Sequence, residues 1–416
     1  MTSSSDTSSP DTEPAAGHER HAGWNELFFD LIAVAGVGRL AHLLHSGPGW
    51  GDLGLYALLY LAFWVSWAGF SVYGDVAARS ARTSTLLIAM LGMAVMAAAV
   101  DGIHSHGYGT AQADAFVIAY VALRWLAGRV WERGSVITDR PLAQMGAGAL
   151  PWLVSLFVGE PWKYWLWTLG LVVDLVVLLT SSRDRALRAA EEQQARRPRH
   201  RIRDPRRGDG TPPRLSEARV DPAHLAERLG LYVIVVLGEG VIQVIDAAAE
   251  HEEWNLPLAA AALGSFALLA AIWALSLLYG ARGIPQLRGS DLPARLAMLL
   301  HAAITAAMAA LAAALGVAVA HPDTQLPAAQ RWLLCAALAG YFTIDLVAAL
   351  TTAPKAAWVA GWAAPCILLP LALGAFGAHL PTWAVVWILA AVACWQILYT
   401  PGPAAAGHPR RRRTTG

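Results

Sequence analysis

Ionisable side chains inside long apolar runs are the residues of this sequence whose types and spacing could do chemistry. A charge in the hydrocarbon core of a bilayer is costly, so such groups face a protein partner or a water-filled cavity and mark ion pathways, proton relays or ion pairs. Their pattern indicates either binding of a cation or proton, or permanent pairing that holds helices together. The set comprises Glu26, Asp30, Arg39, Arg124, Asp174, Arg228, Glu239, His301 and Asp345.

The stretch 225–249 is long and apolar enough to cross a bilayer, yet it carries one polar seam. A helix rising about 1.5 Å per residue needs about 20 residues to cross a core about 30 Å thick. Glu239 lies close to the middle of the stretch, about 16 Å along the helix from Arg228. At about 3.6 residues per turn, five side chains share one narrow stripe: Arg228, Tyr232, Glu239, Gln243 and Asp246.

Asp30 occupies a similarly deep position in the first apolar stretch, and two interpretations of the deep acids stay open. In the first, Asp30 and Glu239 line a shared cavity near the midplane and bind a cation or proton. Arg124 and Arg228 would then be their charge partners. In the second, the same acids pair permanently with arginine or with His301 and fix helix packing. Both interpretations predict contacts between residues far apart in the sequence.

Three further side chains extend this candidate site. Glu26 lies one turn before Asp30 on the same helix face, so the pair would share a proton or chelate a cation, unless Glu26 is simply solvated at the interface. His301 is either a proton relay or a packing histidine. Asp345 fits a binding role and a structural role equally well.

Glycines flank both deep acids. They would permit close approach of helices or local unwinding around a bound substrate, and close packing is the favoured interpretation. The four are Gly36, Gly38, Gly238 and Gly240.

The sequence contains no recognisable enzyme, metal or cofactor motif. It has no Walker A loop, dinucleotide fingerprint, HExxH motif or Ser/His/Asp set. Its three cysteines all lie in apolar runs and are interpreted as core residues. Four histidines near the first two outer connections do not make a full ligand set: His42, His45, His104 and His106. We therefore predict no catalytic residue, no metal and no cofactor.

Composition places the chain among polytopic membrane proteins. Of 416 residues, 56% are hydrophobic and only 15% are charged, and the mean hydropathy is +0.44. Such values with recurring long apolar runs are typical of membrane-spanning helices. The net charge of +1 offers no electrostatic case for a nucleic-acid partner. The expected partners are the lipid bilayer and an ion or small-molecule substrate.

The apolar runs predict an all-α integral membrane protein with about twelve transmembrane helices in two six-helix halves. The fifth run is interrupted by Pro151, and the eleventh is rich in proline. The predicted organisation is a disordered tail (1–18), a first half (19–182), an Arg/Pro-rich cytoplasmic linker (183–224), a second half (225–400) and a basic cytoplasmic tail (401–416). The predicted helices are 24–44, 53–73, 83–101, 111–130, 142–158, 162–181, 225–249, 256–280, 292–319, 331–352, 356–377 and 380–400.

Lysine and arginine support this count independently, because they occur in alternate connections as the positive-inside rule requires. We therefore predict a protein of the cytoplasmic membrane with both termini in the cytoplasm, and basic inner loops that attract anionic lipids. The inner connections, which carry Lys or Arg, are 74–82, 131–141, 182–224, 281–291, 352–355 and the C-terminal tail. The outer connections, which carry neither, are 45–52, 102–110, 159–161, 250–255, 320–330 and 378–379.

The two halves are similar at their starts. Glu19-Arg20 precedes a helix with the deep acid Asp30, and Glu227-Arg228 precedes a helix with the deep acid Glu239, at intervals that differ by one residue. Two halves with the same entry orientation suggest a parallel repeat about an axis along the membrane normal.

Two segments resemble the bacterial low temperature requirement protein A (LtrA) family. They are ERHAGWNELFFDLIAVAGVGRLAHLL (19–44) and ERLGLYVIVVLGEGVIQV (227–244), and the pairing of the two is specific. Three positions depart from the family pattern, namely Asn25, Arg39 and Gly240, and Arg39 adds a cation to an otherwise acidic helix. Weaker similarity covers about residues 18–400 and includes Trp64, Trp67, Tyr73, Asp75, Tyr120, Arg124 and His301.

The resemblance implies a bacterial membrane protein but no reaction, because the family name describes a growth phenotype. Together with the deep acids, it favours an inner-membrane secondary transporter or ion- or proton-translocating protein that uses intramembrane carboxylates. The alternative is a non-transporting membrane protein that supports envelope or lipid function during growth at low temperature. A membrane enzyme ranks third, and no enzymatic activity is expected.

Overall fold

The chain is helical throughout its described residues, apart from one pair of two-residue strands. The computed structural model describes residues 23–76, 83–106, 110–128, 135–136, 148–180, 216–217, 222–280, 283–285, 294–351 and 355–399. The predicted tails (1–18 and 401–416) and most of the predicted linker (183–215 and 218–221) lie outside these residues. The strands β1 (Ser135–Val136) and β2 (Ser216–Glu217) pair in parallel. The all-α fold predicted from the sequence is confirmed.

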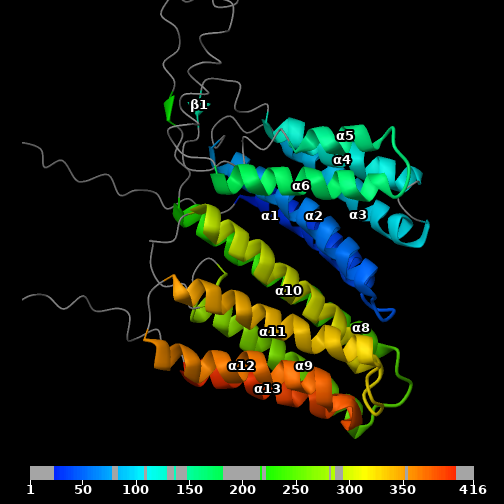
Figure 1. Ribbon diagram of the computed structural model, residues 1–416, viewed down its shortest axis with the longest axis vertical. Helices are drawn as coiled ribbons and strands as arrows, with labels where there is room; N and C mark the ends of the chain where they lie inside the picture. Colours follow the sequence, from blue (N-terminus) through cyan, green and yellow to red (C-terminus); the bar gives the residue numbers. More distant parts are fainter. Residues whose placement is uncertain are drawn as a thin grey trace, which may run out of the picture.

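The helices form two groups that lie side by side (Figure 1). One group contains α1 (Trp24–His42), α2 (Trp50–Val76), α3 (Thr83–His106), α4 (Ala111–Gly128), α5 (Ala149–Ser155) and α6 (Trp162–Thr180). The other contains α8 (Pro222–Ala249), α9 (Leu256–Trp273) with the π-helical turn η4 (Ala274–Leu278), α10 (Ala294–Ala320), α11 (Ala328–Leu350), α12 (Ala356–Phe376) with the 3-10 turn η5 (Gly377–His379), and α13 (Thr382–Tyr399). An internal repeat between the groups stays a prediction.

Nine helices of the described chain are long and apolar enough to cross a membrane. They include α12 despite the two prolines inside it, Pro365 and Pro370. Helices α1 and α4 have 19 and 18 residues, close to the length of a span, but they carry more polar and charged side chains. The described part of the predicted fifth segment is the seven-residue α5, which rises only about 10 Å. The chain is thus a multi-pass helical membrane protein, and the count of twelve spans stays a prediction.

The two groups meet where α8 and α10 pack against α1 and α2. Two glycines of α1 leave room here for side chains, one from α2 within the first group and one from α8 across the interface. A Cβ atom at Gly36 of α1 would overlap the Phe63 ring of α2, and one at Gly38 would lie 2.8 Å from Oε1 of Glu239 on α8. Because α8 continues without interruption from Pro222 to Ala249, Gly36 and Gly38 serve close packing, and no unwinding occurs around Glu239.

Candidate functional site

The polar seam of α8 is buried between the two helical groups. Arg228 and Tyr232 are 1% exposed, and Glu239 and Gln243 are 7% and 6% exposed. Asp246, the last member of the predicted stripe, is exposed. The opposite side of α8 presents apolar side chains, including the exposed Ile234, Ile242 and Ile245. The helix therefore directs its polar stripe into the protein and its apolar face outward, as lipid requires.

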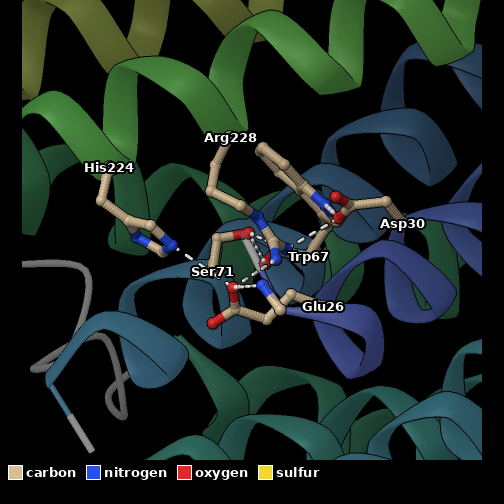
Figure 2. Close-up of polar contacts among 7 residues, drawn as sticks. Glu26, Asp30, Trp67, Ser71, His224 and Arg228 are labelled. Atoms are coloured by element: carbon tan, nitrogen blue, oxygen red, sulfur yellow. Dashed lines mark hydrogen bonds and ion pairs between the residues drawn. The ribbon is translucent and has the colours of Figure 1, made fainter. Parts of the chain in front are cut away.

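Arg228 forms a buried ion cluster with the acids of α1 (Figure 2). Its Nη2 atom lies 2.7 Å from Oδ1 of Asp30, and its Nη1 atom lies 3.6 Å from Oε2 of Glu26. Nη2 also donates to Oγ of Ser71 on α2 at 3.2 Å. Near the start of α8, Nε2 of His224 lies 3.3 Å from Oε2 of Glu26. The cluster combines two carboxylates, one guanidinium and one imidazole.

Asp30 also accepts a hydrogen bond from α2. The indole Nε1 of Trp67 donates to Oδ1 of Asp30 at 2.7 Å, so both donors to Asp30 use the same oxygen. Its other oxygen, Oδ2, is buried and has no hydrogen-bond partner. The Trp67 ring lies on the Tyr232 ring with a centroid separation of 4.2 Å. Asp30 is thus held by α2 and α8 together.

His301 of α10 is held in one tautomer by its two hydrogen bonds. Nε1 of Trp64 lies 3.2 Å from Nδ1 of His301, and an indole N–H is a donor only, so Nδ1 must accept. Nε2 lies 3.0 Å from the carbonyl oxygen of Leu229, so Nε2 must carry the hydrogen. Both nitrogens are satisfied only in the neutral ring. This geometry is that of a packing histidine rather than a proton relay.

Glu239 lies at a second level of the seam, eleven residues after Arg228 on α8 and about 16 Å along the axis. Its Oε1 atom accepts a 2.7 Å hydrogen bond from Nε2 of Gln243, and its carboxylate lies against Gly38 of α1. Gly38 follows Asp30 by eight residues, about 12 Å of helix. The structure therefore shows Asp30 and Glu239 in separate contacts, Asp30 with Arg228 and Glu239 with Gln243.

The surroundings of Glu239 contain no cationic partner within the described part of the chain, where ion pairs involve other acids. Gln243, one turn after Glu239 on α8, extends the polar seam in the direction away from Arg228. Its side chain packs against Gly316 of α10 and lies beside the imidazole of His45, just after α1. A chain of polar side chains thus runs from His45 through Gln243 to Glu239.

His45 is expected to make stability depend on pH. Burial, and then the neighbouring His42, lower the pKa of His45 from 6.5 to about 4. Between these values the unfolded chain binds a proton that the folded protein excludes, so stability is present above about pH 6.5 and is lost as the pH falls toward 4. We expect His45→Gln to flatten this decline in thermal unfolding of purified protein in detergent. The exposed His321→Gln is the control, and parallel profiles for wild type and His45→Gln would contradict the assignment.

Two other predicted site residues, Arg124 and Asp345, have their partners outside the α8 seam. Arg124 of α4 donates to both oxygens of Asp174 on α6, at 2.6 and 3.0 Å, and Nη1 also donates to the Tyr120 hydroxyl at 2.9 Å. The structure pairs Arg124 with neither Asp30 nor Glu239. Its side chain and that of Asp174 are 8% and 1% exposed, which is the arrangement of a structural ion pair within the first group of helices.

Asp345 is likewise separate from the α8 seam. It lies on α11, is fully buried, and accepts a hydrogen bond from Nε2 of Gln396 on α13. Sequence reasoning found Asp345 as a deep acid but did not identify Gln396.

Several partners of the ion cluster were also missed. His224 precedes Arg228 by four residues and therefore shares its helix face, which is a signal that was available. Trp67 and Ser71, which both contact the cluster, are four residues apart on α2 and so share one face of that helix. A polar residue among aromatics on that face could have indicated Ser71.

No group of three or more His, Cys, Asp or Glu side chains within the described ranges is arranged to hold a metal ion. Three of the histidines near the predicted outer connections form local contacts. His42 and His45 pack edge to face, with ring centroids 4.7 Å apart, and Nδ1 of His104 lies 3.8 Å from Oδ1 of Asp52.

Comparison with known proteins agrees with the resemblance noted from the two sequence segments. The chain matches the family described as Bacterial low temperature requirement A protein (LtrA) over residues 21–394. No curated protein matches it. The match spans α1 to α13 and includes both levels of the α8 seam, the Arg124–Asp174 pair and Asp345. This multi-pass helical protein therefore belongs to the bacterial LtrA family.

Proposed function

We propose that this protein is a secondary transporter of the cytoplasmic membrane that binds and releases a proton or small cation at Glu239. The observation that carries the proposal is the charge balance of the buried acids. Glu26, Asp30 and Asp174 each lie beside a cation, whereas the only side-chain hydrogen-bond donor to Glu239 among the described residues is the neutral Gln243 amide. A buried carboxylate without a cationic partner must take up a proton or a cation to be stable in a membrane.

The position of Glu239 supports a role in translocation. It lies on α8, where the two helical groups meet, and relative movement of two halves around a site between them is the usual means of alternating access. The contacts from His45 through Gln243 lead toward Glu239 from one end of the interface. Toward the other end, the cluster of Arg228 with Asp30 and Glu26 joins α1 to α8. We propose that this cluster closes the interface on that side.

The alternative is a non-transporting membrane protein that supports envelope or lipid function in low-temperature growth. The satisfied Arg124–Asp174 and Arg228–Asp30 pairs favour it, because both are arranged as structural contacts. The two functions differ in what they require of Glu239. A transporter needs that carboxyl group to exchange its ligand with water, whereas a structural protein needs only its packing.

Proton and cation flux into proteoliposomes tests the proposal. We expect flux from the wild type, and a fall to the level of protein-free liposomes with Glu239→Gln, because the amide carries no negative charge and has no titratable proton. Gly38→Ala is expected to reduce flux as well, since its Cβ would lie 2.8 Å from Oε1 of Glu239 and would displace the carboxylate.

Gly340→Ala is the matched control, because a Cβ atom there would have no heavy atom within 4 Å apart from its own helix and chain neighbours. Unchanged flux in folded Glu239→Gln would refute the role of this carboxylate. Absence of flux from the wild type across a panel of monovalent and divalent cations and protons would favour the non-transporting alternative.

A further inference from the structure

The second group of helices encloses its own buried acid, apart from the α8 seam. Asp345 is 0% exposed and lies on α11, which packs against α10 and α12. Nε2 of Gln396 donates to Oδ2 of Asp345, whereas Oδ1 is buried and has no hydrogen-bond partner among the residues that the structure describes. Ionising a carboxyl group whose oxygen is buried and unbonded is very costly in a membrane.

Comparison with the other buried aspartates defines what Asp345 lacks. Asp174 receives two guanidinium N–H groups from Arg124, and Asp30 receives one from Arg228 with the indole N–H of Trp67. Asp345 receives a neutral amide, and no cationic side chain of the described residues acts on it. Asp30, Asp174 and Asp345 are thus similarly buried, and of these three Asp345 alone has no compensating charge among the described residues.

The titratable groups around Asp345 are neutral at physiological pH. Tyr341 lies one turn earlier on α11, and its hydroxyl is 2.8 Å from Oγ of Ser276 in the π-helical turn η4. Cys366 of α12 interacts electrostatically with Asp345 and directs its thiol to the Val392 carbonyl. A phenol and a thiol ordinarily titrate well above pH 7.

The basic side chains of helix α10, which packs against α11, are engaged elsewhere. Nη1 of Arg295 donates to the Leu179 carbonyl, and His301 is bonded to Trp64 and Leu229. Neither side chain is thus available to balance a charge on Asp345.

We propose that Asp345 and Gln396 form a second proton-binding site, in which Asp345 holds a carboxyl hydrogen in the resting protein. The ligand is a proton rather than a metal ion, because Gln396 presents an N–H group to the carboxyl and the neighbouring side chains supply no further set of oxygen ligands. Loss of the proton would place a charge among α11, α12 and α13. The helices around it have irregular turns that could respond, namely the π-helical turn η4 and the two prolines of α12. This site is independent of Glu239 and does not require that the protein transports anything.

Infrared spectroscopy of the purified full-length protein in lipid tests the site directly. At neutral pH we expect a carbonyl stretching band of a protonated carboxylic acid that disappears in Asp345→Asn and persists in Glu239→Gln. Gln396→Leu is expected to move this band, because it removes the hydrogen bond from the amide. Asp345→Glu keeps the carboxyl group, and is expected to move the band without removing it if Asp345→Asn does not fold.

An Asp345→Asn spectrum that loses intensity from the ionised carboxylate band, with the carboxylic acid region unchanged, would overturn the proposal. So would a carboxylic acid region that neither Gln396→Leu nor Asp345→Glu alters. The flux experiment on Glu239 is separate, so failure of one proposal leaves the other testable.

Discussion

Replacing Arg228 with leucine is expected to lower the free energy of unfolding by about 3–5 kcal/mol, because it leaves buried carboxylates without their counter-charge. The side chains of Arg228 and Asp30 are 2% and 3% exposed and lie 2.7 Å apart. Glu26 would lose the same guanidinium at 3.6 Å. The measurement is denaturant unfolding of the purified protein in detergent, with retention of helical content checked before unfolding.

The double variant Arg228→Leu with Asp30→Asn separates charge from packing. Removing the acid as well should recover part of the lost stability, because no full charge then remains at Asp30. If the double variant loses as much as the sum of the two single variants, the ion pair between α1 and α8 contributes no coupling. That result would contradict the role assigned to the cluster in joining the two helical groups.

Replacing Arg124 with leucine is expected to have a comparable effect, a loss of about 3–5 kcal/mol. Asp174 is 1% exposed and accepts two hydrogen bonds from this one guanidinium, at 2.6 and 3.0 Å. The loss should appear in unfolding of the first helical group, which contains both residues. Flux should change only as far as folded protein is lost, since the pair lies apart from Glu239.

Asp345→Asn is the matched comparison for Asp174→Asn. Asp174→Asn strands the Arg124 guanidinium in a buried site and should be strongly destabilising. Asp345→Asn exchanges one neutral group for another if Asp345 carries a proton, so its effect should stay below about 1.5 kcal/mol, the usual net contribution of one hydrogen bond. Equal losses in the two variants would mean that Asp345 depends on a charge in the same way as Asp174.

The buried acids of this protein thus differ in charge compensation although their sequence contexts are alike. Each is a single carboxylate in an apolar run, and burial follows from those runs. What separates them is the partner, an arginine for Asp30 and Asp174 or an amide for Glu239 and Asp345. Glu239 and Asp345 are therefore the candidates for proton or cation binding. A buried acid without a fixed cation needs a proton or a mobile cation to neutralise its charge.

The sequence by itself determined the membrane class, the helical fold and the family. Apolar runs of about 20 residues have no other common structural solution in lipid, since backbone groups must be satisfied within the segment. The stripe on α8 was also predictable, because positions on one helix are set by about 3.6 residues per turn. The burial of Arg228, Tyr232, Glu239 and Gln243 follows that prediction.

Only the tertiary structure decided which charges meet. Asp30 and Arg228 are 198 residues apart in the chain, and Asp345 and Gln396 are 51 residues apart. Helix periodicity defines the face on which a side chain lies, but it does not define which helix packs on that face or at what height. Arg228 and Glu239 are eleven positions apart on α8. The first joins an ion cluster and the second has no cationic partner among the described residues, because α1 meets α8 through Asp30 at one level and through Gly38 at the next.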